Sequence, residues 1–263
     1  MVVIKQNITY DSDNDLKVDI YFPNNTSSQT KILIFWHGGG WIKGSKEGSK
    51  ELGIKFANAG FMTLIPDYTL AQTAKFPAAH NDAKKFVDWL LTSKYTDDDD
   101  QKNIVQVGAS AGGTMALMIA GKYGFPTVTW SAPVDFVNWF AHHQEIKPSL
   151  NAASEFNYQD QDKINSSFYK YFTLTYIDGY DSKKLKLLDP INYNYQNLGP
   201  LLMINSAQEL TPISGVYTYL TFLANHNHEV QLTLVPGHGH AMAYALDYLN
   251  ESINFLYQSM KRI

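Results

Sequence analysis

Residues 105–113 read Val-Gln-Val-Gly-Ala-Ser-Ala-Gly-Gly, and this stretch decides how the rest of the chain is organised. An apolar run ends at Gly108, a serine follows two residues later, and Gly112 and Gly113 precede the helix-forming run Thr-Met-Ala-Leu-Met-Ile-Ala. The pattern predicts a strand, a sharp turn and a helix, with Ser110 at the turn. The spacing Gly108-x-Ser110-x-Gly112 is typical of a turn that holds a nucleophilic serine in a strained conformation.

Small residues flank Ser110 on both sides, as is required where the backbones of a strand and a helix nearly touch. Ala109 and Ala111 satisfy this requirement. The following helix would point its free N–H groups and its positive end at the serine oxygen, where an oxyanion would form. The alternative interpretation is a glycine-rich turn between a strand and a helix in which the serine is incidental.

The composition limits the possible classes of protein. The chain has 263 residues, 44% of them hydrophobic, with no linker or internal repeat, so we predict a single domain over residues 1–263. The net charge is -4 without a basic stripe, so neither nucleic acid nor a membrane is expected as a partner. No cysteine is present, which excludes disulfides. Residues 1–20 are rich in charge and no apolar run could span a bilayer, so we expect a cytoplasmic protein.

Apolar runs bounded by turn residues alternate with amphipathic stretches along most of the chain. Residues 2–9 and 16–22 are expected to pair as an antiparallel hairpin at a sheet edge. Further strands are predicted at 31–36, 61–65, 104–107, 126–132, 201–205 and 230–235, and helices at 45–59, 76–91, 114–120, 212–225 and 241–260. This order predicts an α/β fold with a mostly parallel sheet, helices on both faces and reactive groups at the carboxyl ends of the strands.

Residues 136–198 interrupt this alternation. They are rich in Asn, Tyr, Phe and Gln, and short helices are expected near 136–143 and 164–171. The segment is longer than an ordinary connection, so we predict an insertion that lies over the functional site as a lid.

A glycine-rich loop, His37-Gly38-Gly39-Gly40-Trp41, follows a strand that reads as buried on both faces. Three glycines let backbone N–H groups turn toward a ligand, and in serine hydrolases such a loop supplies oxyanion-hole donors. The glycine patterns of phosphate-binding loops are absent from it. We expect His37 to brace the loop, and Trp41 to be either a pocket wall or a core side chain.

Nucleophilic acyl transfer needs a serine, a base that takes its proton and donors for the oxyanion. His238 and His240 both follow the last predicted strand, and either could be the base. The alternative for a lone loop histidine is a surface position. The chain order of serine, acid and histidine favours the catalytic interpretation, because this architecture uses that order.

Three groups of motifs carry a resemblance to a known family. They are His37-Gly38-Gly39-Gly40-Trp41; Asp67-Tyr68-x-Leu70-Ala71 with Phe76-Pro77-Ala78-Ala79 and Asp82; and Gly108-Ala109-Ser110-Ala111-Gly112-Gly113. Together they resemble the α/β-hydrolase fold, and within it the carboxylesterases similar to hormone-sensitive lipase and kynurenine formamidase. The resemblance extends over about residues 30 to 260.

The resemblance implies roles for individual residues. Ser110 is the nucleophile, and the backbone N–H groups of Gly38, Gly39 and Ala111 form the oxyanion hole. The family pattern of glycine, any residue, glycine and histidine matches Gly237-His238-Gly239-His240, which makes His240 the base.

One position departs from the family pattern. Aligned on the Leu-x-Pro that follows it, the position of the triad acid holds Gln208, which carries no charge. Glu209 is one residue along, although adjacent residues that leave a strand tend to point to opposite faces. Asp135, after another strand, is the second candidate. A serine–histidine dyad without an acid is the third possibility.

These observations predict an enzyme without a metal or other cofactor, a serine esterase that hydrolyses small carboxylic esters with short acyl groups. One alternative is an amide hydrolase of the arylformamidase type, in which Trp41 and the aromatic insertion stack an aryl substrate. Another is a weakly active or inactive hydrolase-fold protein that binds a small ligand, because Gln208 occupies the acid position. The sequence does not determine the oligomeric state.

Overall fold

The computed structural model describes residues 2–24 and 30–260. Its strands are β1 (Val3–Asp11), β2 (Leu16–Phe22), β3 (Ile32–Trp36), β4 (Met62–Pro66), β5 (Ile104–Ala109), β6 (Thr127–Trp130), β7 (Leu201–Ser206) and β8 (Val230–Val235). Its α-helices are α1 (Lys50–Asn58), α2 (Ala78–Thr92), α3 (Ala111–Tyr123), α4 (Phe136–His142), α5 (Ala152–Glu155), α6 (Gln161–Ile177), α7 (Ser182–Leu188), α8 (Ile213–Asn225) and α9 (Leu249–Met260). Short 3-10 helices are η1 (Glu47–Ser49), η2 (Asp100–Asn103), η3 (Pro190–Asn192) and η4 (Ala241–Ala243).

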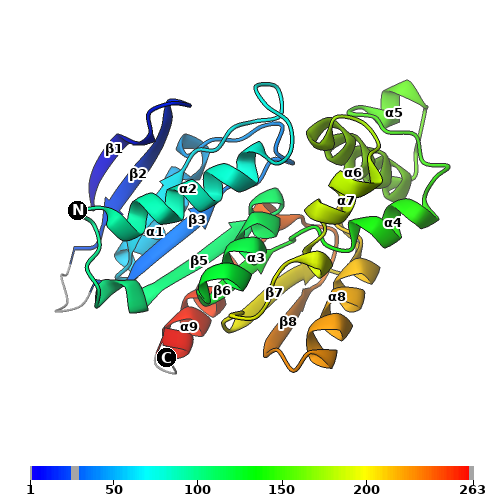
Figure 1. Ribbon diagram of the computed structural model, residues 1–263. Helices are drawn as coiled ribbons and strands as arrows, with labels where there is room; N and C mark the ends of the chain where they lie inside the picture. Colours follow the sequence, from blue (N-terminus) through cyan, green and yellow to red (C-terminus); the bar gives the residue numbers. More distant parts are fainter. Residues whose placement is uncertain (1, 25–29, 261–263) are drawn as a thin grey trace.

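The strands form one sheet in the order β1-β2-β4-β3-β5-β6-β7-β8 (Figure 1). Strand β2 runs antiparallel to β1 and β4, and every other neighbouring pair is parallel. The predicted edge hairpin and the mostly parallel sheet are therefore confirmed. The carboxyl ends of the parallel strands meet along one edge, which is where a site on such a sheet is expected.

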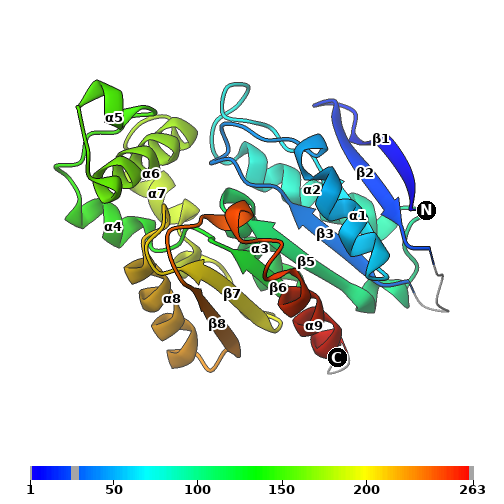
Figure 2. The same cartoon turned by 180° about the vertical axis from the view of Figure 1, so that it is seen from behind.

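Helices cover both faces of the sheet. Helices α1 and α9 lie on one face, seen in front in Figure 2, and α2, α3 and α8 lie on the other. Every residue of β3, β4 and β5 is buried, as expected of parallel strands covered on both sides. Side chains alternate between the two faces: in β7, Leu202 and Ile204 pack with the α9 side, whereas Leu201 and Met203 pack with the α8 side.

The predicted helix 241–260 is wrong in its first half. Only η4 and α9 are helical, and the residues between them form turns. The side chain of Tyr244 is buried, and its hydroxyl donates to the carbonyl oxygen of Ile204 at 2.6 Å. The backbone N–H of Ala241 donates to Ser131 Oγ at 2.9 Å. These long-range bonds hold the segment against the strand ends and override its local helix propensity.

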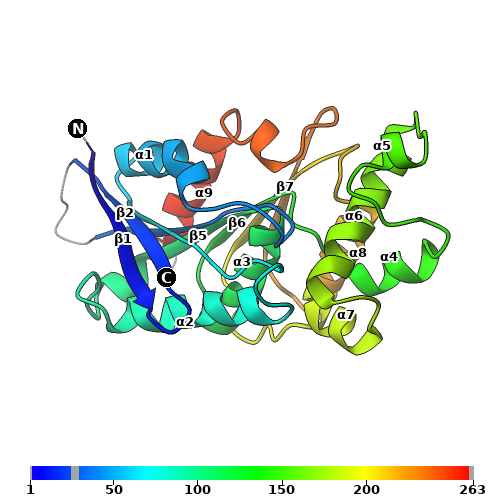
Figure 3. The same ribbon diagram turned by 90° about the horizontal axis from the view of Figure 1, so that it is seen from above.

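The insertion 136–198 contains α4 to α7 and lies beyond the carboxyl ends of β6 and β7 (Figures 1 and 3). Helix α6 is longer than the helix predicted at 164–171, and it begins where the Asp160 carboxylate accepts the N–H of Asp162. Aromatic side chains of α6 belong to the same core as α2 and α3. That the insertion acts as a lid stays a prediction. None of the helices within the described residues is long and apolar enough to cross a membrane.

Candidate active site

Ser110 lies between β5 and α3 with φ 50° and ψ -124°, a conformation that non-glycine residues rarely adopt. Its side chain is almost buried. A Cβ on Gly108 would lie 2.5 Å from the carbonyl oxygen of Gly112, and one on Gly113 would lie 2.7 Å from Ala132 Cβ. A Cβ on Gly112 would overlap the carbonyl oxygen of Trp36. The elbow therefore needs its glycines for space, as the sequence predicted.

His240, and not His238, lies beside Ser110. Its Nε2 is 2.9 Å from Ser110 Oγ, and the side chain is 25% exposed, so a substrate can reach this pair. His238 is exposed, and its Nδ1 donates to the carbonyl oxygen of Gln208 at 3.0 Å. The loop after β8 thus directs the two histidines differently, with His240 beside Ser110 and His238 exposed to solvent.

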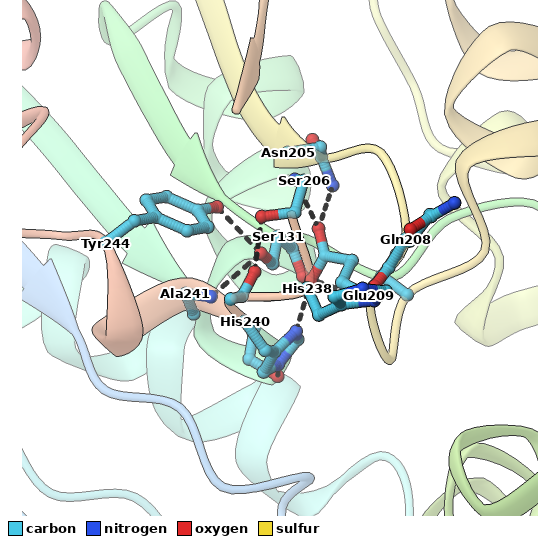
Figure 4. A network of polar contacts seen from close by, with 12 residues as sticks. Ser131, Asn205, Ser206, Gln208, Glu209, His238, His240, Ala241 and Tyr244 are labelled. Atoms are coloured by element: carbon cyan, nitrogen blue, oxygen red, sulfur yellow. Dashed lines mark hydrogen bonds and ion pairs between the residues drawn. The ribbon is translucent and has the colours of Figure 1, made fainter. Parts of the chain in front are cut away.

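Glu209 supplies the carboxylate next to His240. Its side chain is completely buried, and Oε2 accepts a hydrogen bond from His240 Nδ1 (Figure 4). Oε1 accepts the backbone N–H of Ser206 at 2.9 Å and the side-chain amide of Asn205 at 3.3 Å. A buried carboxylate is costly unless it is paired and hydrogen-bonded, and these donors meet that requirement.

Asp135, the second candidate for the acid, lies away from His240. Asp135 precedes α4, accepts a hydrogen bond from Asn138 at 2.9 Å and faces Gly215 of α8, so it does not contact His240. Burial raises the pKa of the Asp135 carboxyl. A dyad would leave Nδ1 of His240 without a carboxylate, whereas here Glu209 contacts that atom. Glu209 can point toward His240 because the chain leaves β7 in a turn, where side chains do not alternate between two faces as they do in a strand.

The glycine-rich loop passes directly against the elbow. A Cβ on Gly38 would lie 3.0 Å from the carbonyl oxygen of Ala109 and 3.2 Å from Ser110 Cβ. Gly39 has φ 119°, and its carbonyl oxygen accepts two backbone N–H groups of the same loop. Ala111 is the first residue of α3. The predicted oxyanion donors therefore belong to segments that meet at Ser110.

His37 lies under the glycine-rich loop. It is buried, its ring stacks on Tyr68 with centroids 4.2 Å apart, and Nδ1 donates to the carbonyl oxygen of Gly38 at 2.9 Å. Burial lowers the pKa of His37 to about 4, so the ring is neutral at pH 7. These contacts agree with a structural brace.

Trp41 is a core residue and not a pocket wall. Its ring is fully buried and stacks on Tyr176 with centroids 4.6 Å apart. Phe172 and Phe136 also pack against it. Of the two interpretations of Trp41, these contacts agree with the core side chain, because the indole points into the aromatic core.

A cavity of about 300 Å³ opens at Ser110 and His240, and we call it the serine cavity. The sequence reasoning missed most of its walls, which are formed by Lys43, Phe168, Phe172, Leu210 and Met242. Phe168 and Phe172 come from α6 in the insertion, and the Lys43 ammonium lies 5.8 Å from the Phe168 ring centroid. Their only sequence signal was the aromatic richness of 136–198. Within residues 2–24 and 30–260, no cluster of His, Asp or Glu side chains could hold a metal ion.

Comparison with known proteins places the chain in a family. The BD-FAE family model matches residues 18–211. Carboxylesterase NlhH of Mycobacterium tuberculosis is 26% identical over 117 residues, which cover 44% of this chain and 37% of that enzyme. Ethyl acetate hydrolase of Pseudomonas putida is 24% identical over 89% of this chain and 73% of its own length.

Solved structures show the same fold at low sequence identity. A truncated carbohydrate esterase from gut microbiota has a TM-score of 0.76 at 17% identity, covering 98% of this chain and 96% of its own. An esterase of the bacterial hormone-sensitive lipase family has a TM-score of 0.72 at 20% identity, covering 98% of this chain and 85% of its own. The chain has the α/β-hydrolase fold and belongs to the BD-FAE family.

Proposed function

We propose that this protein is a serine hydrolase that cleaves small carboxylic esters through an acyl-enzyme. The observation that carries the proposal is the continuous chain of contacts from Glu209 through His240 to Ser110 at the mouth of an apolar cavity. Serine, base and carboxylate in this geometry form the arrangement that activates a hydroxyl for attack on a carbonyl carbon. The carboxylesterases among the relatives add support for ester bonds as the target.

In the proposed mechanism, Ser110 Oγ attacks the ester carbonyl carbon while His240 Nε2 takes its proton. The Glu209 carboxylate keeps the proton of His240 on Nδ1 and stabilises the imidazolium. The backbone N–H groups of Gly38, Gly39 and Ala111 bind the oxyanion of the tetrahedral intermediate. His240 then gives its proton to the leaving alcohol, and a water molecule activated by the same histidine releases the acid from Ser110.

The serine cavity supports a preference for short acyl groups. Its volume of about 300 Å³ is at the lower end of the range for small-molecule sites. Phe172 and Leu210 restrict it, and Phe168 and Met242 lie at its more exposed side. The arylformamidase alternative loses the support of Trp41, whose ring is buried, and keeps only the aromatic side chains of the insertion, Phe168 and Phe172. The inactive-binder alternative rested on the missing carboxylate at position 208, and the Glu209 carboxylate beside His240 removes that motive.

The experiment combines a fluorophosphonate probe with turnover of p-nitrophenyl acetate and butyrate. We expect the probe to label the protein at Ser110, and Ser110→Ala to lose both labelling and turnover, by about 10⁴-fold or more in kcat. Ser45→Ala, which changes another serine of the same cavity, is the matched control and should remain active. Undiminished hydrolysis by folded Ser110→Ala would contradict the proposal.

A further inference from the structure

A second cavity of about 600 Å³ lies between α2, α3, α7 and η3. It shares no lining residue with the serine cavity. The three helices lie on the same side of the sheet in Figures 1 and 3, with α7 arriving from the insertion. We call it the lysine cavity, because Lys84 of α2, Lys122 of α3 and Lys184 of α7 line it.

The described lining of the lysine cavity contains no Asp or Glu side chain, so its fixed charge is positive. Lys122 has one carboxylate nearby, Asp88, at 4.0 Å. Among the residues that the structure describes, no carboxylate oxygen lies within 4.0 Å of the ammonium nitrogen of Lys84 or Lys184. The Lys184 ammonium donates to the carbonyl oxygen of Ile177 at 2.9 Å, which orients it without neutralising it. Lys122 also donates to Tyr123 Oη at 2.7 Å, so Lys84 and Lys184 are the lysines of the described lining without such a partner, and their charge favours an anion.

Apolar side chains make up much of the remaining wall. Phe76 and Met118 are partly buried, whereas Leu187 is 65% exposed beside the lysines. An exposed leucine at the rim of a cavity leaves apolar surface in water that a ligand could cover. The lining therefore combines positive charge with an apolar surface, the complement of a molecule with a charged end and an apolar body.

His80 forms a polar group at the base of the lysine cavity. It is 2% exposed, and Nδ1 lies 2.9 Å from Tyr176 Oη. Nε2 lies 3.3 Å from Tyr193 Oη, which is long for a hydrogen bond, so a ligand oxygen could compete for it. Burial lowers the pKa of His80 to about 3, so the ring stays neutral and adds no repulsion toward the lysines.

We propose that the lysine cavity binds a small amphipathic carboxylate, with its apolar chain against Phe76, Met118 and Leu187 and its carboxylate among the three ammonium groups. One negative charge with a hydrocarbon body fits this lining better than a polyphosphate, whose several charges would lie against apolar walls. The proposal does not depend on ester hydrolysis, because the two cavities have no residue in common.

The test measures binding of octanoate to the purified protein by titration calorimetry at low ionic strength. We expect one saturable site whose affinity falls as salt is added. Octanamide, of the same length without the charge, should bind at least about tenfold more weakly. Lys84→Gln combined with Lys122→Gln and Lys184→Gln should weaken octanoate binding at least about tenfold as well.

Two control variants locate the site. Lys183→Gln with Lys186→Gln removes two exposed charges from the same helix α7, and Lys43→Gln removes the lysine of the serine cavity. Neither should change octanoate affinity by more than about twofold. Asn81→Trp, at an exposed position of the lining, should block the site by filling it.

Several outcomes would overturn the proposal. The first is that octanoate shows no saturable binding up to about 10 mM, and the second is that the folded triple lysine variant binds octanoate with unchanged affinity. The third is that Lys43→Gln weakens octanoate binding as much as the triple lysine variant does. The last outcome would assign the octanoate site to the serine cavity. Circular dichroism of every variant separates loss of binding from loss of fold.

Discussion

The carboxylate of Glu209 contacts Nδ1 of His240 from the turn that follows β7, one residue after Gln208. Gln208 is exposed and contributes its backbone carbonyl oxygen to His238, while Glu209 turns inward and becomes completely buried. Residues 207–211 form turns and bends, so the glutamate side chain can reach the ring from the residue after the position where the family pattern places its acid.

Removing the charge of Glu209 should nearly abolish ester turnover. We expect Glu209→Gln to lower kcat by about 10³- to 10⁴-fold, because an amide can hold the ring of His240 but cannot neutralise the imidazolium. Initial rates with p-nitrophenyl acetate measure the effect. Gln208→Asp is the control and should change kcat by less than about threefold, since its side chain is exposed. A large gain in Gln208→Asp, or a fully active Glu209→Gln, would contradict this assignment.

Replacing either of the two histidines after β8 by alanine should lower ester turnover to very different extents. His240→Ala should lose about as much activity as Ser110→Ala, because base and nucleophile act as a unit. His238→Ala should keep most of its activity, since its ring donates only to a backbone carbonyl at the surface. Turnover of p-nitrophenyl butyrate by both purified variants measures the difference. A greater loss of turnover in His238→Ala than in His240→Ala would assign the base to His238.

The size of the serine cavity should set the acyl-chain preference. We expect the protein to hydrolyse acetyl and butyryl esters faster than octanoyl esters. Phe168→Ala should raise kcat/KM for octanoate esters relative to acetate esters by about tenfold, because it opens the partly exposed wall that α6 contributes. Phe156→Ala changes an aromatic residue of the insertion outside this cavity and is the control. The same chain-length profile in Phe168→Ala and the unsubstituted protein would show that Phe168 does not limit the acyl group.

The neutral His37 should make the fold sensitive to acid. The unfolded state binds a proton near pH 6.5, but burial lowers the pKa of His37 in the folded state to about 4. Stability is therefore lost as the pH falls from about 6.5 toward 4, and His37 alone should lower the free energy of unfolding by about 2 kcal/mol between pH 7 and pH 5.

Urea unfolding of the His37→Asn variant at both pH values tests this account. The loss of stability from pH 7 to pH 5 should be about 2 kcal/mol smaller in the variant than in the unsubstituted protein. His142→Asn changes an exposed histidine and serves as the control, with an unchanged pH dependence. If His37→Asn lost as much stability as the unsubstituted protein, the buried ring would not be the source of the acid sensitivity.

Local patterns in the sequence predicted the fold of this protein and the turn that holds Ser110. The order of strands and helices, the edge hairpin and the glycine-lined elbow at Ser110 were all predicted correctly. These features depend on side-chain size, periodicity and backbone freedom over short stretches of chain, and such properties are visible in neighbouring residues. The residues alone left His238 and His240 open, and the resemblance of Gly237-His238-Gly239-His240 to the family pattern favoured His240.

Contacts between side chains of distant segments were determined only by the tertiary structure. It brings Glu209, and not Asp135, beside His240, and the buried carboxylate also accepts hydrogen bonds from Ser206 and Asn205. It turned Trp41 inward against Tyr176, which lies 135 residues further along the chain. It also delayed the start of the helix predicted at 241–260 to Leu249, because long-range hydrogen bonds of Ala241 and Tyr244 compete with local helix propensity.

The walls of the two cavities also come from segments that are far apart in the sequence. Walls of the serine cavity come from the glycine-rich loop, the elbow, α6 and the loop after β8, and the lysine cavity joins α2, α3 and α7. The sequence neighbours of each wall residue do not mark it as part of a cavity, because a phenylalanine or a lysine on a helix is common. Their convergence depends on how the helices pack around the sheet, because burial of apolar surface acts on the whole chain and not on any one segment.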